Sequence, residues 1–174
     1  YLFGGQFSAR LNMNLRQDKG YSYGYTSSIA WHHSLSTLLA GGSVQTAVTR
    51  ESVEETLKEF GDIIDIRPVT EEEFDAARNG LLRGIPSQFA TIGQTLSQLT
   101  GMVLFDLPED SFAAYADNLR AVTLEDVRRV ARDRIDRRHL SVLIVGDRQV
   151  IEPGLRELGL PIVPVDYGGN ELGC

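Results

Sequence analysis

Gly20 separates two different periodicities, and this change constrains the fold more than any other feature of the sequence. Before it, apolar residues recur every four residues from about residue 6 to residue 16, which predicts a helix with one apolar face. After it, tyrosines alternate with small polar residues, which predicts a strand running from residue 21 to about residue 31. Glycine commonly follows the last turn of a helix. The residues that carry the two periods are Phe7, Leu11 and Leu15, and then Tyr21, Tyr23 and Tyr25.

A second strand is expected from about residue 36 to residue 48, paired with the first as an antiparallel hairpin. A block of helices follows. Thr49 is a plausible N-cap of the first of these helices, and Thr70 with Glu73, and Thr123 with Asp126, have the spacing of capping boxes. A helix over residues 92–105 is expected to turn an apolar stripe inward. The residues of that stripe are Ile92, Leu96, Leu99 and Val103.

Leu140 to Val145 is a nearly continuous apolar run closed by Gly146, which is typical of a buried strand. The predicted order is therefore a helix, a hairpin, a block of helices and a strand that returns to the sheet. We expect an α+β fold in which an antiparallel sheet packs on a layer of helices, formed by residues 1–174 as one domain.

Composition excludes several classes of function. The chain has 174 residues and a formal net charge of −7, which argues against a nucleic-acid partner because phosphate binding needs clustered Lys and Arg. The arginine-rich stretch from Arg128 to Arg138 is interrupted by acids and is interpreted as a solvated helix face. No apolar run has the length of a membrane span. The single cysteine, Cys174, cannot form an internal disulfide and is not expected to be a catalytic thiol.

Metal chemistry is not expected from this chain alone. His32 and His33 are adjacent in a predicted turn beside a strand, where neighbouring side chains point to opposite faces, so both cannot easily bind one ion. His139 is distant in sequence. A zinc site formed by these three histidines is the weakest of the alternatives. It would require stoichiometric zinc in the purified chain.

Arg16 and Tyr23 are the candidate functional residues. A tight turn between the helix end and the strand could bring a guanidinium and a phenol to the same side, where they could hold a peptide carbonyl or a developing oxyanion. The alternative is structural, because an arginine favours the C-terminal end of a helix and a strand tyrosine is often packing.

Several motifs in this order resemble the second half-domain of pitrilysin/insulysin-type zinc peptidases, which is related to mitochondrial processing peptidases and to bacterial homologues. The resemblance covers nearly the whole chain. The matching motifs are Phe3-Gly4-Gly5-Gln6-Phe7-Ser8-Ala9-Arg10-Leu11-Asn12, Leu15-Arg16, Gly20-Tyr21-Ser22-Tyr23-Gly24, Val44-Gln45-Thr46, Asp106-Leu107-Pro108-Glu109-Asp110, Ala121-Val122-Thr123-Leu124-Glu125-Asp126-Val127 and Val145-Gly146-Asp147.

The resemblance implies a division of labour. In that family one half-domain binds zinc through a His-x-x-Glu-His motif and a further Glu, and the other half supplies an Arg and a Tyr that bind the substrate. By position these would be Arg16 and Tyr23. This chain has no His-x-x-Glu-His motif and lacks the opening strands of the half-domain. It is therefore expected to be part of a larger two-domain protein, with no cofactor of its own.

The resulting hypothesis is the substrate-binding half of a zinc metalloendopeptidase that cleaves peptides or small unfolded proteins and is not catalytic alone. Its expected partners are a peptide and a homologous zinc-bearing domain or subunit, fused or in a homo- or heterodimer. The alternative is an inactive peptide-binding or structural subunit of the same family. The composition is that of a soluble protein, and the single cysteine fits the cytoplasm without excluding the periplasm. The resemblance is to bacterial members of the family, and the compartment stays open.

Overall fold

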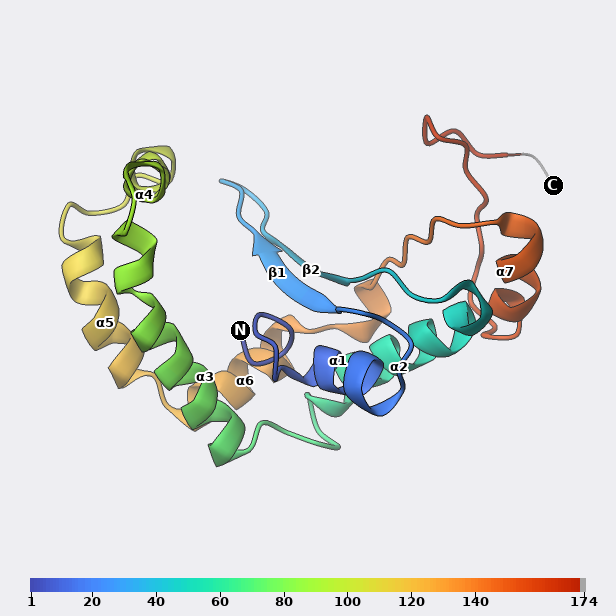
Figure 1. Cartoon of the computed structure of the whole chain (residues 1–174), viewed down its shortest axis with the longest axis horizontal. Helices are drawn as coiled ribbons and strands as arrows, with labels where there is room; N and C mark the ends of the chain where they lie inside the picture. The colour runs from blue at the N-terminus through green and yellow to red at the C-terminus, as the bar shows by residue number, and fades with distance from the viewer. Residues whose placement is uncertain (173–174) are drawn as a thin grey trace.

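An antiparallel hairpin lies against a layer of helices in the computed structural model, which describes residues 1–172 (Figure 1). Its strands are β1 (Thr26–Ala30) and β2 (Thr37–Gly41), with Thr26 opposite Gly41 and Ala30 opposite Thr37. An isolated bridge between Ser22 and Val44 extends the pairing below the hairpin. The α+β class and the hairpin predicted from the alternating tyrosines are confirmed.

The helices occupy most of the remaining chain. The first, α1 (Arg10–Asn12), continues directly as a π-helical segment (Met13–Asp18). The others are α2 (Thr49–Asp62), α3 (Glu71–Gly84), α4 (Ile92–Leu104), α5 (Ser111–Ala121), α6 (Leu124–Arg134) and α7 (Arg148–Arg156).

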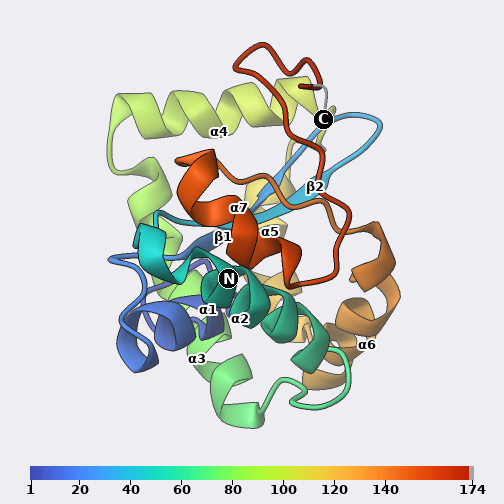
Figure 2. The ribbon, with the colours of Figure 1, turned by 90° about the vertical axis from the view of Figure 1, so that its right-hand side faces the viewer.

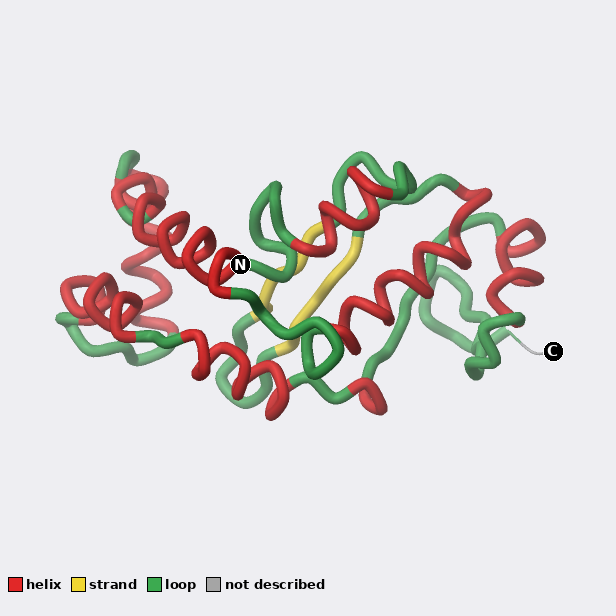
Figure 3. The backbone as a smooth tube through the Cα atoms, turned by 90° about the horizontal axis from the view of Figure 1, so that it is seen from below, coloured by secondary structure: helices red, strands yellow, loops and turns green. Residues whose placement is uncertain are grey.

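The helices form two groups on either side of the hairpin. In Figure 1, α3, α4 and α5 form an arm at the left, while α7 and the C-terminal segment lie at the right, beyond α2. Figure 2 shows α4 side-on, running across the end of this arm. From below, the two strands lie between the helical groups (Figure 3). The hairpin tip reaches the end of α4, where the rings of His33 and Phe105 are 5.6 Å apart.

The hydrophobic core lies where α1, α2 and α3 meet the base of the hairpin. Leu11 and Leu15, on the predicted apolar face of the first helix, are both fully buried. Phe3 and Phe60 pack edge to face with their ring centroids 4.8 Å apart. The buried cluster comprises Phe3, Leu11, Leu15, Tyr25, Phe60, Ile63, Val69, Phe74 and Ala131.

Both predicted capping boxes are present. The Glu73 amide donates to the Thr70 hydroxyl, and the Thr70 amide donates to the Glu73 carboxylate at 2.9 Å. Thr123 and Asp126 make the same reciprocal pair at the start of α6. These bonds satisfy amides that have no partner inside the helix.

Several predicted boundaries move. The first helix begins at Arg10 instead of about residue 6, and the first strand begins at Thr26 instead of Tyr21. The N-cap of α2 is Val48, and Thr49 is the first helical residue, with its hydroxyl donating to the Thr46 carbonyl at 2.9 Å. The preceding residues 46–48 form a 3-10 turn that extends the entry into the helix.

Three burial predictions are wrong. Phe7, expected on the apolar face with Leu11 and Leu15, lies before the helix and is 60% exposed. The apolar stripe of α4 faces solvent, and Val103 is 85% exposed. Residues 140–145 are extended but form no strand, and Val145 is 93% exposed. An apolar run becomes a strand only when a neighbouring backbone accepts and donates its hydrogen bonds, and the only strand pair in residues 1–172 is β1 with β2. Residues 85–105 and 140–146, which are largely exposed, contain no Asp, Glu, Lys or Arg.

Within residues 1–172, none of the helices combines the length and the hydropathy needed to cross a bilayer. Cys174 lies outside the described residues.

Candidate functional site

Arg16 lies in the last turn of the π-helical segment, as predicted for a helix end. Its guanidinium carbon lies 4.6 Å from the centroid of the Phe7 ring, a cation–π contact worth about 0.5–1 kcal/mol at an exposed site. Among the described residues, the guanidinium makes no hydrogen bond or ion pair with another group of the chain. Its N–H donors are therefore available to a ligand while the ring orients the group.

Tyr23 points into solvent, with 95% of its surface exposed, and lies at a bend before β1. The residues on either side are anchored. The buried Ser22 hydroxyl lies 2.8 Å from the Ser43 carbonyl oxygen and accepts the Gly24 amide at 3.0 Å. Tyr25 is buried in the core, and its phenol oxygen accepts a hydrogen bond from Thr56 at 2.9 Å. The Tyr23 side chain is therefore exposed, while the backbone on either side of it is held by hydrogen bonds.

The turn between the two candidates ties the helix end to the tyrosine segment. The Leu15 carbonyl accepts the amides of both Tyr21 (2.8 Å) and Ser22 (3.2 Å). Gly20 adopts a φ of +66°, which reverses the chain at little steric cost. The Gln45 side chain donates to the Gly20 carbonyl at 3.0 Å. Arg16 and Tyr23 thus stand on two elements joined by backbone hydrogen bonds, although no bond joins their side chains in the described residues.

A charged pocket of about 380 Å³ lies beside the same helix. Its acids and bases pair with one another: Arg67 with Glu59 at 2.5 Å and Lys19 with Glu55 at 3.0 Å. The Asn14 amide donates to Glu59 at 2.8 Å. The Lys19 and Asn14 contacts hold the first helix against α2, and the Arg67 pair ties the loop after α2 to the same helix. The pocket includes neither Arg16 nor Tyr23.

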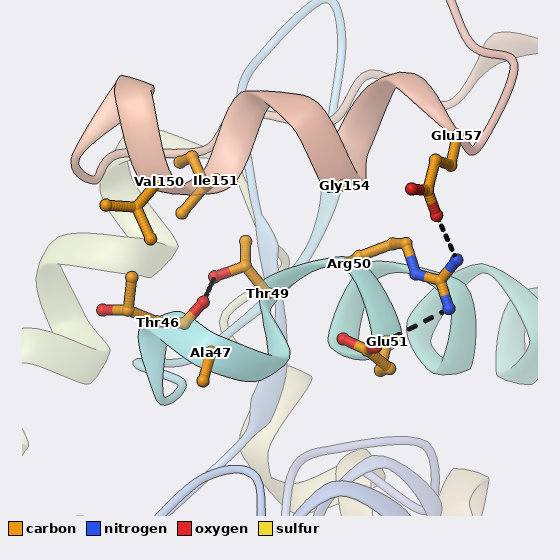
Figure 4. Close-up of a pocket in the computed structure, with 9 residues that line it drawn as sticks. All are labelled: Thr46, Ala47, Thr49, Arg50, Glu51, Val150, Ile151, Gly154 and Glu157. Atoms are coloured by element: carbon orange, nitrogen blue, oxygen red, sulfur yellow. Dashed lines mark hydrogen bonds and ion pairs between the residues drawn. The ribbon is translucent and has the colours of Figure 1, made fainter.

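A second pocket, of about 310 Å³, lies between the start of α2 and α7 (Figure 4). Arg50 spans it, donating to Glu157 of the segment after α7 at 2.8 Å and lying 3.6 Å from Glu51. The Cα of Gly154 faces the Arg50 side chain, where a Cβ would meet it at 3.6 Å. This pocket is best explained as the seam where α7 docks on α2.

The histidines do not assemble into a metal site. His33 packs against Phe105 at the hairpin tip, and His139 Nδ1 lies 3.0 Å from the Asp136 carboxylate. In residues 1–172, no group of three or more His, Cys, Asp or Glu side chains could hold a metal ion. The residues present therefore do not fit a zinc ion.

Part of the arginine-rich stretch is neutralised by acidic residues nearby in the sequence. Arg132 pairs with Glu125 at 2.7 Å and Arg138 with Asp136 at 2.8 Å. The sequence predicted that this stretch is a solvated helix face. Arg128 departs from that prediction, because it donates to the Val69 carbonyl at 2.9 Å and so links α6 to the loop before α3.

From the sequence, Phe7 was assigned to an apolar helix face, and Asn12 and Ser22 were given no supporting role. Asn12 is buried, its amide donates to the Phe7 carbonyl at 2.7 Å, and its oxygen accepts the Tyr25 amide at 3.1 Å. The only sequence signal is a polar residue next to the apolar face that carries Leu11 and Leu15.

Comparison with known proteins identifies the family pattern in the N-terminal part of the chain. Residues 1–81 match the sequence model of the peptidase M16 inactive domain. No curated protein matches the sequence significantly.

Solved structures share the fold over more of the chain. One is the peptidase M16 inactive domain from Pseudomonas fluorescens, with a TM-score of 0.68 and 19% identity over 78% of this chain and 32% of that chain. Another is the inactive peptidase domain of a candidate zinc protease from Bordetella parapertussis, with a TM-score of 0.63 and 18% identity over 76% of this chain and 71% of that one. A candidate zinc protease from Bordetella pertussis gives a TM-score of 0.62 and 19% identity over 76% and 71%. The chain thus spans about a third of the Pseudomonas fluorescens structure. The TM-scores show a common fold, and at identities below 20% the similarity shows the fold alone.

Proposed function

Since residues 1–81 match the sequence model of the peptidase M16 inactive domain, we propose that this chain is the substrate-binding half of a zinc-dependent metalloendopeptidase. The observation that carries the proposal is that the Phe7 ring orients the Arg16 guanidinium, while the hydrogen-bond donors of Arg16 and Tyr23 remain accessible to a ligand. Arg16 rests on Phe7 without an intramolecular hydrogen bond, and Tyr23 is 95% exposed on an anchored segment.

The chemistry of the two residues suits a peptide backbone. A guanidinium and a phenol both donate hydrogen bonds, and the carbonyl oxygen of a peptide accepts them. When that oxygen gains negative charge during hydrolysis, donors held in place stabilise it without reorganising. Arg16 would supply charge as well as donors, and Tyr23 would supply a single directional O–H.

The zinc is proposed to be held by a homologous half, in the same polypeptide or in a second subunit, because the described residues contain no group that fits a metal. The bound metal would activate water for hydrolysis in that half. The substrate class proposed is peptides and small unfolded proteins, which reach the site in extended form.

The test is Arg16→Ala and Tyr23→Phe in the assembled, zinc-loaded enzyme. Each should lower kcat/KM for a model peptide by about ten- to a thousandfold, the scale for loss of one oxyanion donor. Arg120→Ala and Tyr167→Phe remove an exposed guanidinium on α5 and an exposed phenol near the C-terminus, and both should leave kcat/KM unchanged. Wild-type kinetics in both site variants would sink the proposal.

An inactive peptide-binding subunit is the second candidate, because the family model that residues 1–81 match describes an inactive domain. The two candidates differ in the assembled protein. A peptidase half requires a His-x-x-Glu-His motif in the same polypeptide or in a subunit that copurifies with it, and hydrolysis that stops when zinc is removed by a chelator. A binding subunit retains peptides without hydrolysing them.

A further inference from the structure

A single buried side chain connects the supports of both candidate residues. Asn12 ends α1 and is only 4% exposed. Its Nδ2 donates to the Phe7 carbonyl at 2.7 Å, and its Oδ1 accepts the amide of Tyr25 at 3.1 Å. One amide group therefore joins the loop before the helix to the segment that leads into β1.

The hydrogen bond from Asn12 to the Phe7 carbonyl affects the position of Arg16. Phe7 lies outside regular helix, and its exposed ring carries the Arg16 guanidinium at 4.6 Å. The Asn12 bond fixes the backbone from which that ring projects. Without it, the ring would lose its fixed position and Arg16 would lose the surface that orients it.

The hydrogen bond from the Tyr25 amide to Asn12 affects the position of Tyr23. The amide held by Asn12 lies two residues beyond Tyr23, and on the other side Ser22 is held by its contact with the Ser43 carbonyl. The backbone that carries Tyr23 is thus held by hydrogen bonds on both sides. One of these bonds is made by Asn12, which belongs to the same helical segment as Arg16.

We propose that Asn12 is a positioning residue of the site, which sets Arg16 and Tyr23 relative to each other so that both can donate to one peptide carbonyl oxygen. This inference rests on the proposed function. Asn suits the role because its amide donates on one side and accepts on the other. Aspartate has the same shape but, when ionised, cannot donate to the Phe7 carbonyl, so Asn12→Asp removes one link with the least change in volume.

The test is a double-mutant cycle in the assembled enzyme. Asn12→Asp should lower kcat/KM by about tenfold or more in the wild-type background, with the loss mainly in kcat, because misplacing a positioned group by about 1 Å can cost a hundredfold. In the Arg16→Ala/Tyr23→Phe background the same change should cost less than about twofold, because the residues through which it acts are already gone. Asn118→Asp, at an exposed position on α5, is the matched control and should have no effect in either background.

Equal losses in both backgrounds would show that Asn12 acts on folding alone and would overturn the inference. Thermal unfolding of each variant identifies loss of the folded protein. If Asn12→Asp does not fold, Phe7 provides the second test because its side chain is exposed. Phe7→Trp keeps the stacking surface and should retain activity, whereas Phe7→Ala should lower kcat only where Arg16 is present; equal activity of the two Phe7 variants would contradict the inference.

The two proposals fail in distinguishable ways. Wild-type kinetics in Arg16→Ala and Tyr23→Phe would overturn the proposed function and, with it, the positioning role. Impaired kinetics in those variants, combined with an Asn12 effect that is equal in both backgrounds, would overturn the positioning role alone.

Discussion

Arg10 holds Glu73 through two parallel hydrogen bonds, from Nε to Oε1 and from Nη2 to Oε2, both 2.6 Å long. The same guanidinium donates to the Arg67 and Pro68 carbonyls, and Glu73 also completes the capping box of α3. The pair therefore joins α1, the loop before α3 and the first turn of α3 at one point.

Arg10→Met should destabilise the protein by about 3 kcal/mol, because the arginine side chain is 3% exposed and its removal leaves two carbonyls without this donor and a carboxylate without its ion-pair partner. Urea unfolding measures the change. Arg120→Met breaks an exposed pair with Asp117 and should cost less than about 1 kcal/mol. Equal costs for the two variants would contradict this account of Arg10.

Glu73 should make stability depend on acid pH. Burial raises the pKa of its carboxyl, but the bonds from Arg10 and Thr70 outweigh burial and hold the pKa below its usual value. A lowered folded-state pKa stabilises the protein above the unfolded-state value of roughly 4.3, and this contribution is lost as the pH falls through the folded-state pKa. The free energy of unfolding should therefore fall below about pH 4, and the fall should be shallower in Glu73→Gln. If the free energy of unfolding of the wild type and of Glu73→Gln fell equally with pH, the prediction for Glu73 would be contradicted.

Gly20→Ala should destabilise the turn before Tyr23 by about 1 kcal/mol, since φ is +66° and an L residue is strained there. A Cβ at Gly20 would meet no atom within 4 Å, so the cost is in the backbone alone. Gly101→Ala is the matched control. It lies in α4, where a Cβ is equally free of contacts, and alanine should stabilise the helix by about 0.5–1 kcal/mol. Chemical denaturation should show opposite signs for the two variants.

Leu11→Ala should cost about 2–5 kcal/mol, because this side chain is fully buried and its truncation leaves a cavity. Leu35→Ala, near the hairpin tip where the side chain is largely exposed, removes the same atoms and should cost less than about 0.5 kcal/mol. The comparison is best made by urea unfolding at one temperature. A small loss at Leu11 would show that the core is not centred on this helix.

The candidate site was only partly predictable. The sequence placed Arg16 at a helix end and Tyr23 after a tight turn, because the change of period and Gly20 are local signals. The buried amide of Asn12 was not predictable, since its two partners come from segments on opposite sides of it in the chain. A polar residue near an apolar helix face indicates neither what it binds nor that it is buried.

What the sequence determined by itself is the set of helices, the hairpin and the two capping boxes. The hydrogen bonds of the helices and capping boxes join residues a few positions apart, and the strands of the hairpin are neighbours in the chain, so propensity and spacing are enough to specify them. Tertiary structure decided what those patterns could not: that the α4 stripe faces solvent, that residues 140–145 form no strand, and that Asn12 links Phe7 to Tyr25. Burial and strand pairing need a partner surface supplied by a distant segment, and an apolar period specifies a face without specifying what covers it.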